Sequence, residues 1–76
     1  PETIQREILK YCLEPQSIVA LMRIFGRTNR TKFKTDFLTL LLEQGLLERT
    51  IPDRPTSKNQ KYRTTTLGKK ILHHEQ

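Results

Sequence analysis

The chain has 76 residues, with 14 lysines and arginines against 8 aspartates and glutamates, which gives a formal net charge of +6 and a pI near 9.9. A chain of this length forms one domain with one small core, which excludes a separate substrate-binding lobe. The positive charge favours a polyanionic partner, with nucleic acid first; a basic surface that only maintains solubility is the alternative.

The sequence has no signal-peptide pattern and no apolar run long enough to cross a membrane. Its most apolar stretch, 37–42, already contains Thr39 and is followed directly by Glu43. Cys12 is the single cysteine, so no disulfide forms within the chain, and a lone thiol fits a reducing compartment. We therefore expect a cytoplasmic protein with no membrane partner. Because the chain begins at Pro1 and not at a methionine, we expect a piece of a larger protein in preference to a processed chain.

The basic side chains fall in two blocks. Residues 27–34 hold four basic side chains and no acid, and residues 49–70 hold seven, with Asp53 as the acid among them. The segment between the blocks, 35–48, holds three acids and no base. This segregation favours a nucleic-acid-binding surface over a charge that serves solubility alone.

Residues 3–14 have apolar side chains at the i, i+4, i+7 and i+8 spacing of an amphipathic helix. Thr3 is the expected N-cap, and Pro15 is the expected end of the helix. The apolar face comprises Ile4, Ile8, Tyr11 and Cys12, with Leu9 and Leu13 beside them.

Residues 17–25 predict a second, shorter helix. Ser17 is a good N-cap, and Gly26 stands where a helix ends on a left-handed residue. The apolar face of this helix comprises Ile18, Leu21, Met22 and Phe25.

A third helix is predicted over 30–44, after a polar turn, with Thr28 or Asn29 as its cap. At 100° per residue, the inward side chains are Phe33, Phe37, Leu40 and Leu41, and the outward ones are Lys32, Thr35, Asp36, Thr39 and Glu43. Leu38 and Leu42 fall on the flank of the helix. They either pack under the following hairpin or contact another protein.

Gly45 ends this helix, and the residues after it predict two strands, 46–51 and 60–65. The loop between them, 52–59, has Pro-Asp and Pro-Thr-Ser turn chemistry, and its prolines stiffen it. The simplest register pairs Ile51 with Gln60, Arg49 with Tyr62, and Glu48 with Arg63. The last of these is a favourable cross-strand ion pair, which supports the register.

The order helix, helix, turn, helix, strand, loop, strand predicts an α+β fold. It is that of a winged helix-turn-helix domain, with three helices followed by a two-stranded β-hairpin wing. We expect a single domain over residues 1–76. Beyond Gly68 the sequence allows a short helix, but we expect residues 70–76 to be a frayed tail.

The run LLLEQGLLERTIPDRPTSKNQKYRTT, with the upstream GRTNRTKFKTDFL, resembles the C-terminal winged-helix domain of bacterial RecG-like ATP-dependent DNA helicase-related proteins. The same domain type occurs in proteins regarded as transcriptional regulators and at the end of some Fic-type proteins. The likeness covers nearly the whole chain and is most specific from Gly45 to Tyr62. It implies a DNA-binding winged-helix module appended to a larger helicase-related or regulatory protein. It implies no ATPase activity here, because the chain has no Gly-rich phosphate-binding loop.

The candidate DNA-binding side chains lie at the start of the third helix and in the wing. Helix-turn-helix proteins contact bases mainly through the N-terminal part of this helix, where Arg can bind guanine and Asn can bind adenine. The candidates there are Arg27, Thr28, Asn29, Arg30, Lys32 and Thr35. In the wing, the candidates for phosphate or minor-groove contact are Arg54, Lys58 and Lys61. The alternatives are a solvated turn with helix caps and a mobile, solvated loop.

Three other side chains modify this hypothesis. Asp36 and Glu43 on the exposed face count against deep insertion into a groove, because carboxylates repel phosphates. Tyr62 has the chemistry to stack on a base, but a tyrosine on a half-buried strand is expected in the core.

The sequence shows no catalytic arrangement, so we expect a non-enzymatic domain with no cofactor and no small-molecule substrate. His73 and His74 are adjacent and cannot share a helix face, and no metal site is expected there. Cys12 is expected to pack in the core. The expected partners are double-stranded DNA and other domains of the parent chain. The rival hypothesis is a protein–protein interaction or dimerisation module that uses the edge strand of the wing or the flank of Leu38 and Leu42.

Overall fold

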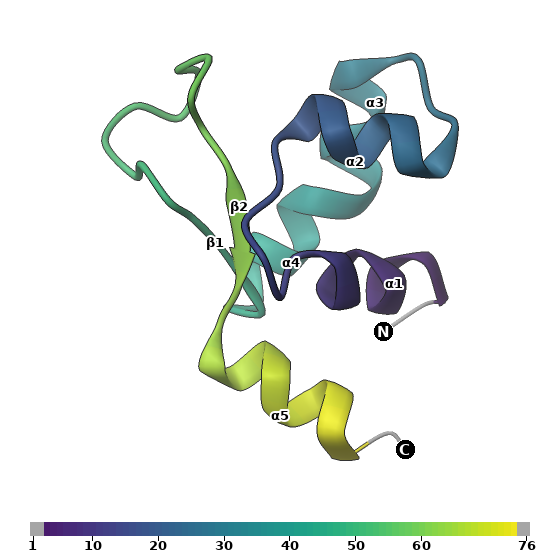
Figure 1. Ribbon diagram of the computed structural model, residues 1–76, viewed down its shortest axis with the longest axis vertical. Helices are drawn as coiled ribbons and strands as arrows, with labels where there is room; N and C mark the ends of the chain where they lie inside the picture. The colour runs from purple at the N-terminus through teal and green to yellow at the C-terminus, as the bar shows by residue number, and fades with distance from the viewer. Residues whose placement is uncertain (1–2, 75–76) are drawn as a thin grey trace.

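The structure, a computed structural model, describes residues 3–74. Its elements in chain order are α1 (Thr3–Tyr11), α2 (Ile18–Phe25), a third helix in the three segments α3 (Arg30–Phe33), η1 (Lys34–Leu38) and α4 (Thr39–Glu43), the strands β1 (Leu47–Arg49) and β2 (Tyr62–Thr64), and α5 (Thr66–His74). In Figure 1 the wing loop and the α2–α3 turn lie at one end of the molecule, and α5 lies at the other. This order confirms the predicted α+β winged-helix fold.

The first helix is shorter than the sequence predicts. Thr3 is already a helical residue, and α1 ends at Tyr11, well before Pro15. Tyr11 and Leu13, which the sequence places on or beside the apolar face, are exposed. The ring of Tyr11 instead packs edge-on against Phe25, with 5.8 Å between the ring centroids.

The predicted caps of the next two helices are confirmed. Ser17 Oγ accepts a hydrogen bond from the backbone N–H of Ala20 at 3.1 Å, and Gly26 ends α2 with φ 64°. Of the two candidate caps of the third helix, Asn29 is the one used, because its Oδ1 accepts from the N–H of Lys32 at 3.0 Å. These short-range hydrogen bonds satisfy N–H groups that have no partner within the helix.

The third helix contains a π-helical segment, which changes the face that it presents to the core. The backbone N–H of Thr39 bonds to the carbonyl of Lys34, five residues earlier. The extra residue in this turn delays the helical rotation, so the buried positions after Phe33 are Leu38 and Leu41. Leu40, predicted to point inward, is 43% exposed, whereas Leu38 is 1% exposed. The prediction of an inward Leu40 is therefore wrong, and Leu38 belongs to the core.

The two strands pair in the predicted antiparallel register. Glu48 lies opposite Arg63, and Arg49 lies opposite Tyr62. The ion pair between the first two residues also forms, with 2.9 Å between Arg63 Nε and Glu48 Oε2. Both strands are shorter than expected, since each keeps three residues.

A buried glutamine side chain takes the place of the missing strand pairs at the base of the wing. Gln60 Oε1 accepts from the N–H of Ile51 at 2.9 Å, and its Nε2 donates to the carbonyl oxygens of Ile51 and Arg54 at 2.6 and 2.9 Å. The predicted pairing of Ile51 with Gln60 therefore exists, but it is made by a side chain. These bonds hold the start and the end of the wing loop together.

The hairpin also pairs with the segment between α1 and α2. Gln16 and Tyr62 exchange two backbone hydrogen bonds, of 3.0 and 2.8 Å. This bridge adds a short extended segment to the open edge of β2. It fixes the N-terminal end of α2 beside the base of the wing.

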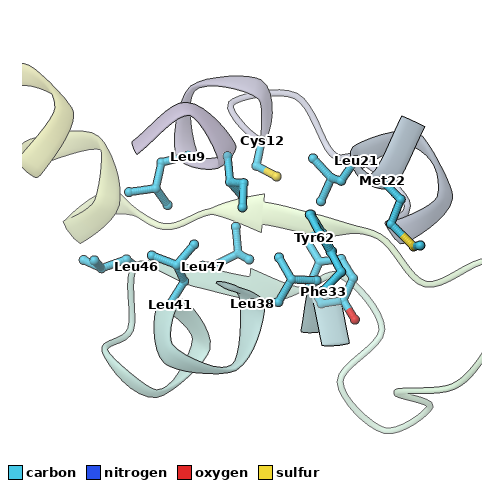
Figure 2. Close-up of a cluster of buried hydrophobic side chains, with 11 residues drawn as sticks. Leu9, Cys12, Leu21, Met22, Phe33, Leu38, Leu41, Leu46, Leu47 and Tyr62 are labelled. Carbon is cyan, nitrogen blue, oxygen red and sulfur yellow. The ribbon is translucent and has the colours of Figure 1, made fainter. Parts of the chain in front are cut away.

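The core lies between the helices and the hairpin. Figure 2 shows Leu9 of α1 and Cys12, the residue after α1, on one side of the strands and Leu38 and Leu41 from the third helix on the other. Tyr62 is buried among these residues, as predicted. The fully buried thiol of Cys12 is likewise a packing group.

The chain continues after the hairpin as a regular helix. Residues 70–74 belong to α5, so the prediction of a frayed tail is wrong for them, and residues 75–76 lie outside the described part. α5 packs against α1 and the end of β2. Gly68 is buried at this contact. No helix within residues 3–74 is long and apolar enough to cross a membrane.

Candidate nucleic-acid interface

A hollow of about 380 Å³ lies between the third helix and the wing. We call it the helix–wing hollow. Its walls are the N-terminal end of α2, the side chains of Arg30 and Lys34, wing residues 55–58, and Gln60 and Tyr62 of the hairpin. The hollow thus brings together two segments, 30–34 and 55–58, that come from the two basic blocks of the sequence.

A second hollow, of about 410 Å³, continues this surface along α2. It shares Val19 and Arg30 with the helix–wing hollow and is also lined by Arg23 and Arg27. Within residues 3–74, neither lining includes an acidic side chain. We call the cations of the two hollows the basic face, which comprises Arg23, Arg27, Arg30, Lys34 and Lys58.

Local structure explains why the helical cations of the helix–wing hollow lie together. Asn29 caps α3, so Arg30 is its first residue. Lys34 follows four residues later, which places it on the same side of the helix, one turn on.

The wing cation is positioned by consecutive turns. The N–H of Ser57 bonds to the carbonyl of Arg54 at 3.0 Å, and the N–H of Gln60 bonds to the carbonyl of Ser57 at 3.0 Å. Ser57 Oγ also accepts from the N–H of Asn59 at 3.1 Å. These bonds enclose Lys58 on both sides, so its backbone is held although its side chain is exposed.

A third and smaller hollow, of about 210 Å³, adjoins the second one at the turn, because Arg27 and Thr28 line both. Here Lys32 Nζ lies 3.2 Å from Asp36 Oδ2, and the guanidinium of Arg27 lies 5.3 Å from the centroid of the Phe37 ring. Asp36 lines this hollow and neither of the two that form the basic face. The carboxylate that counted against groove insertion therefore borders the basic face at Arg27 and lies beside a lysine that offsets its charge.

The predicted site residues differ in the hollows that they line. Those that line the two hollows of the basic face are Arg27, Thr28, Arg30 and Lys58. Asn29 and Lys32 line only the hollow that contains Asp36, which Arg27 and Thr28 line as well. Thr35, Arg54 and Lys61 line none of the three hollows. For Lys61 the reason is strand alternation, because its neighbours Gln60 and Tyr62 are buried and it points to the opposite side of the hairpin.

Two basic residues of this surface are absent from the sequence-based set. Lys34 carries a usable signal, because it belongs to the first basic block and stands one helical turn after Arg30. Arg23 belongs to the segment 1–26, which is neutral overall, so only the packing of α2 reveals it.

Cys12 and the two histidines are titratable groups outside the hollows that have reactive or metal-binding chemistry. Burial raises the pKa of the Cys12 thiol to about 12, so the thiol is held in its neutral, unreactive form. His73 and His74 are exposed at the end of α5. Within residues 3–74 no three His, Cys, Asp or Glu side chains are grouped so that they hold a metal ion.

Comparison with known proteins gives two matches. The chain matches the family model of the filamentation induced by cAMP protein Fic-like, C-terminal domain, over residues 5–65. Its structure is similar to a crystal structure of a Fic family protein from Desulfovibrio desulfuricans G20, with a TM-score of 0.70 and 32% sequence identity. That similarity covers 87% of this chain and 21% of the other, so the chain spans about a fifth of the length of this relative. No curated protein matches the chain.

These matches bear on the family resemblance drawn from the sequence. They support the part that concerned Fic-type proteins. The parts that concerned helicase-related proteins and transcriptional regulators stay predictions.

Proposed function

The chain belongs to the family of Fic-like C-terminal domains, and on that premise we propose that it is a non-catalytic module that binds double-stranded DNA through its basic face. The observation that supports this proposal most strongly is the helix–wing hollow. In it Arg30 and Lys34 from the third helix and Lys58 from the wing line one concave surface. A concave surface with charges of one sign concentrates the potential that attracts a polyanion.

The basic face divides by the kind of contact that each side chain is suited to make. Arg27 and Arg30 stand at the turn and the first residue of the third helix, where helix-turn-helix proteins contact base edges. An arginine there can bind guanine through two hydrogen bonds. Lys34 and Lys58 are better suited to phosphates, which fix the position of the protein but carry no sequence information.

The rival hypothesis of a protein-docking module loses one of its two surfaces. Leu38 is in the core, and Leu42 is partly buried and packs against it, so this flank is not free for a partner. The surfaces that remain accessible to a protein partner are the short edge strand β1 and exposed apolar side chains such as Leu40. Docking on other domains of the parent protein is therefore the second candidate function. We take a Fic-type protein as the parent, and a helicase-related or regulatory protein is the alternative.

A matched pair of double variants tests the DNA-binding proposal. Arg30→Ala with Lys58→Ala removes two charges from the helix–wing hollow, and Arg54→Ala with Lys61→Ala removes two charges that line none of the hollows. We expect the first pair to raise the Kd for a duplex by about 10- to 100-fold, and the second by less than about 3-fold. Fluorescence anisotropy with two unrelated duplexes measures both values.

The same experiment separates the two candidate functions. If both double variants lose the same amount of duplex affinity, only the net charge matters, and this result contradicts a defined basic face. No binding of the unaltered chain at low salt contradicts the proposal as a whole. If Leu40→Glu alters association with other parts of the parent protein while both charge pairs leave duplex binding unchanged, the docking hypothesis replaces it.

A further inference from the structure

Tyr62 has a hydroxyl group without a hydrogen-bond partner among residues 3–74, although the residue is only 2% exposed. The hydroxyl oxygen is not among the enclosed side-chain atoms of residues 3–74 that lack a partner, so the tip of the buried ring reaches the surface, where another group can accept its hydrogen bond. Figure 2 shows the ring beside Phe33, with its oxygen directed away from the cluster of leucines. Tyr62 lines the helix–wing hollow, so this hydroxyl is a hydrogen-bond donor at the base of a cationic surface.

Further donors surround the same hollow. Ser17 Oγ accepts the N–H of Ala20, so its own hydroxyl proton remains available for another acceptor. Ser17 also begins α2, and the first N–H groups of a helix carry partial positive charge and favour an anion. Arg30 and Lys34 approach from the third helix, and Lys58 approaches from the wing.

We propose that the helix–wing hollow is a binding site for a single phosphate group, in which Tyr62 donates a hydrogen bond to a non-bridging oxygen. The proposal rests on the proposed function, in which the phosphate is a phosphodiester of the bound DNA strand. Ser17 and the start of α2 provide the other neutral donors. Arg30, Lys34 and Lys58 compensate the negative charge.

This site has a defined role in recognition. It is formed jointly by α2, the third helix and the wing, so one phosphate placed there fixes the position of all three relative to the DNA backbone. A phosphate contact carries no information on base sequence. The hydroxyl of Tyr62 therefore contributes affinity equally on different duplexes.

The variant Tyr62→Phe tests the proposal, because it removes one oxygen and keeps the buried ring. The matched control is Tyr11→Phe, which removes the same group from an exposed ring that lines none of the three hollows. We expect Tyr62→Phe to raise the Kd by about 10-fold on two unrelated duplexes. The slope of log K against log salt stays as in the unaltered chain, because no charge is removed. Tyr11→Phe leaves the Kd unchanged.

Thermal unfolding of the same variants separates binding from a structural role. Since the hydroxyl of Tyr62 has no partner within the described chain, Tyr62→Phe should keep or slightly raise the Tm. A lowered Tm shows that the hydroxyl is bonded within the protein and overturns the proposal. An unchanged Kd also overturns it, and leaves the DNA-binding function standing.

Titration with inorganic phosphate identifies the source of the phosphate group. We expect amide NMR signals of residues 17–19 and 56–58 to shift in the unaltered chain, and to shift less in Tyr62→Phe. If phosphate binds in this way but no duplex binds, the DNA-binding function fails and the hollow is a site for a free phosphate compound. If neither phosphate nor duplex perturbs these signals, both proposals fail.

Discussion

Gly68 is the residue that decides how closely α5 approaches the hairpin. A Cβ atom at this position would meet the carbonyl oxygen of Leu46, and would lie 2.6 Å from Cγ2 of Thr64. The Leu46 oxygen belongs to the backbone, which cannot move aside as the end of a flexible side chain can. The glycine is therefore needed for the close approach of the helix, although its own backbone conformation is an ordinary helical one.

We expect Gly68→Ala to destabilise the protein by about 1–3 kcal/mol, because it overpacks this contact. In an unconstrained helix the same change is stabilising, since alanine has the higher helix propensity by about 1 kcal/mol. The sign of the effect in urea denaturation therefore tests the packing directly. Lys69→Ala, at an exposed position of the same helix, is the control and should stay within about 0.5 kcal/mol.

The buried thiol of Cys12 gives a prediction on pH. Its pKa is raised from 9.0 to about 12 by burial, so folding favours the neutral thiol. A group with a raised pKa contributes stability that is complete below the unfolded pKa and is lost as the pH rises through the folded one. The contribution of Cys12 should therefore be present at pH 8 and decline between about pH 9 and about pH 12.

Two measurements check this expectation. Alkylation by iodoacetamide at about pH 8.5 should be slow in the native chain and fast in urea, because only the exposed thiolate reacts. The difference in unfolding free energy between the unaltered chain and Cys12→Ala should narrow above about pH 9. Rapid alkylation of the folded chain contradicts the burial of this residue.

At the scale of elements, the third helix shows how a small change in backbone geometry redistributes its side chains. The π-helical hydrogen bond from Thr39 to Lys34 inserts one extra residue into the turn. The spacing from Phe33 to Leu38 is consequently five residues, and the next buried side chain is Leu41. A helix with a constant 100° rotation places Leu40 inside instead.

Alanine substitutions distinguish these two geometries. Leu38→Ala should cost about 2–5 kcal/mol, because it leaves a cavity in the core. Leu40→Ala should change the stability by no more than about 0.5 kcal/mol, because its side chain is exposed. Chemical denaturation measures both. A large loss of stability in Leu40→Ala with a small loss in Leu38→Ala would contradict the π-helical segment and support an uninterrupted α-helix.

For the whole molecule, the arrangement of charge predicts how binding responds to salt. The five cations of the basic face lie in hollows that share Val19 and Arg30, so we expect a single duplex to reach them together. If each neutralises one phosphate, log K should fall with log salt at a slope of about −4 to −5. Lys34→Ala should reduce the slope by about 1, whereas Lys61→Ala should not change it.

Anisotropy titrations from low to physiological salt give this slope. A slope near zero, or the same reduction for Lys34→Ala and Lys61→Ala, shows that the basic face does not act as one surface. The comparison of Lys34→Ala with Lys61→Ala therefore tests whether the salt dependence is set by where a charge lies in the fold, and not only by how many charges the chain carries.

The candidate interface was predictable in part. The two basic blocks of the sequence indicated a positively charged surface, and the structure places Arg27, Arg30 and Lys58 in the two adjoining hollows. Lys61 lines none of the three hollows, because the charge of a residue does not tell which side of a hairpin it occupies. Whether this surface binds DNA stays a prediction.

The sequence by itself determined the features that depend on neighbouring residues. Ser17, Gly26 and Asn29 set helix boundaries through hydrogen bonds and backbone conformations that span at most one turn. The pairing of Glu48 with Arg63 followed from the loop bounds, 52–59, which set the register of the hairpin. Such features need no knowledge of the rest of the fold, because the groups involved meet wherever the segment forms.

Only the tertiary structure decided the features that depend on contacts between distant segments. The π-helical segment exposes Leu40 while the core takes in Leu38, and α5 exists as a helix with a packing partner because Gly68 lets it reach the hairpin. The helix–wing hollow joins Arg30 to Lys58, which are far apart in the sequence. In each case the deciding quantity is the space between packed elements, and a single segment of sequence does not contain it.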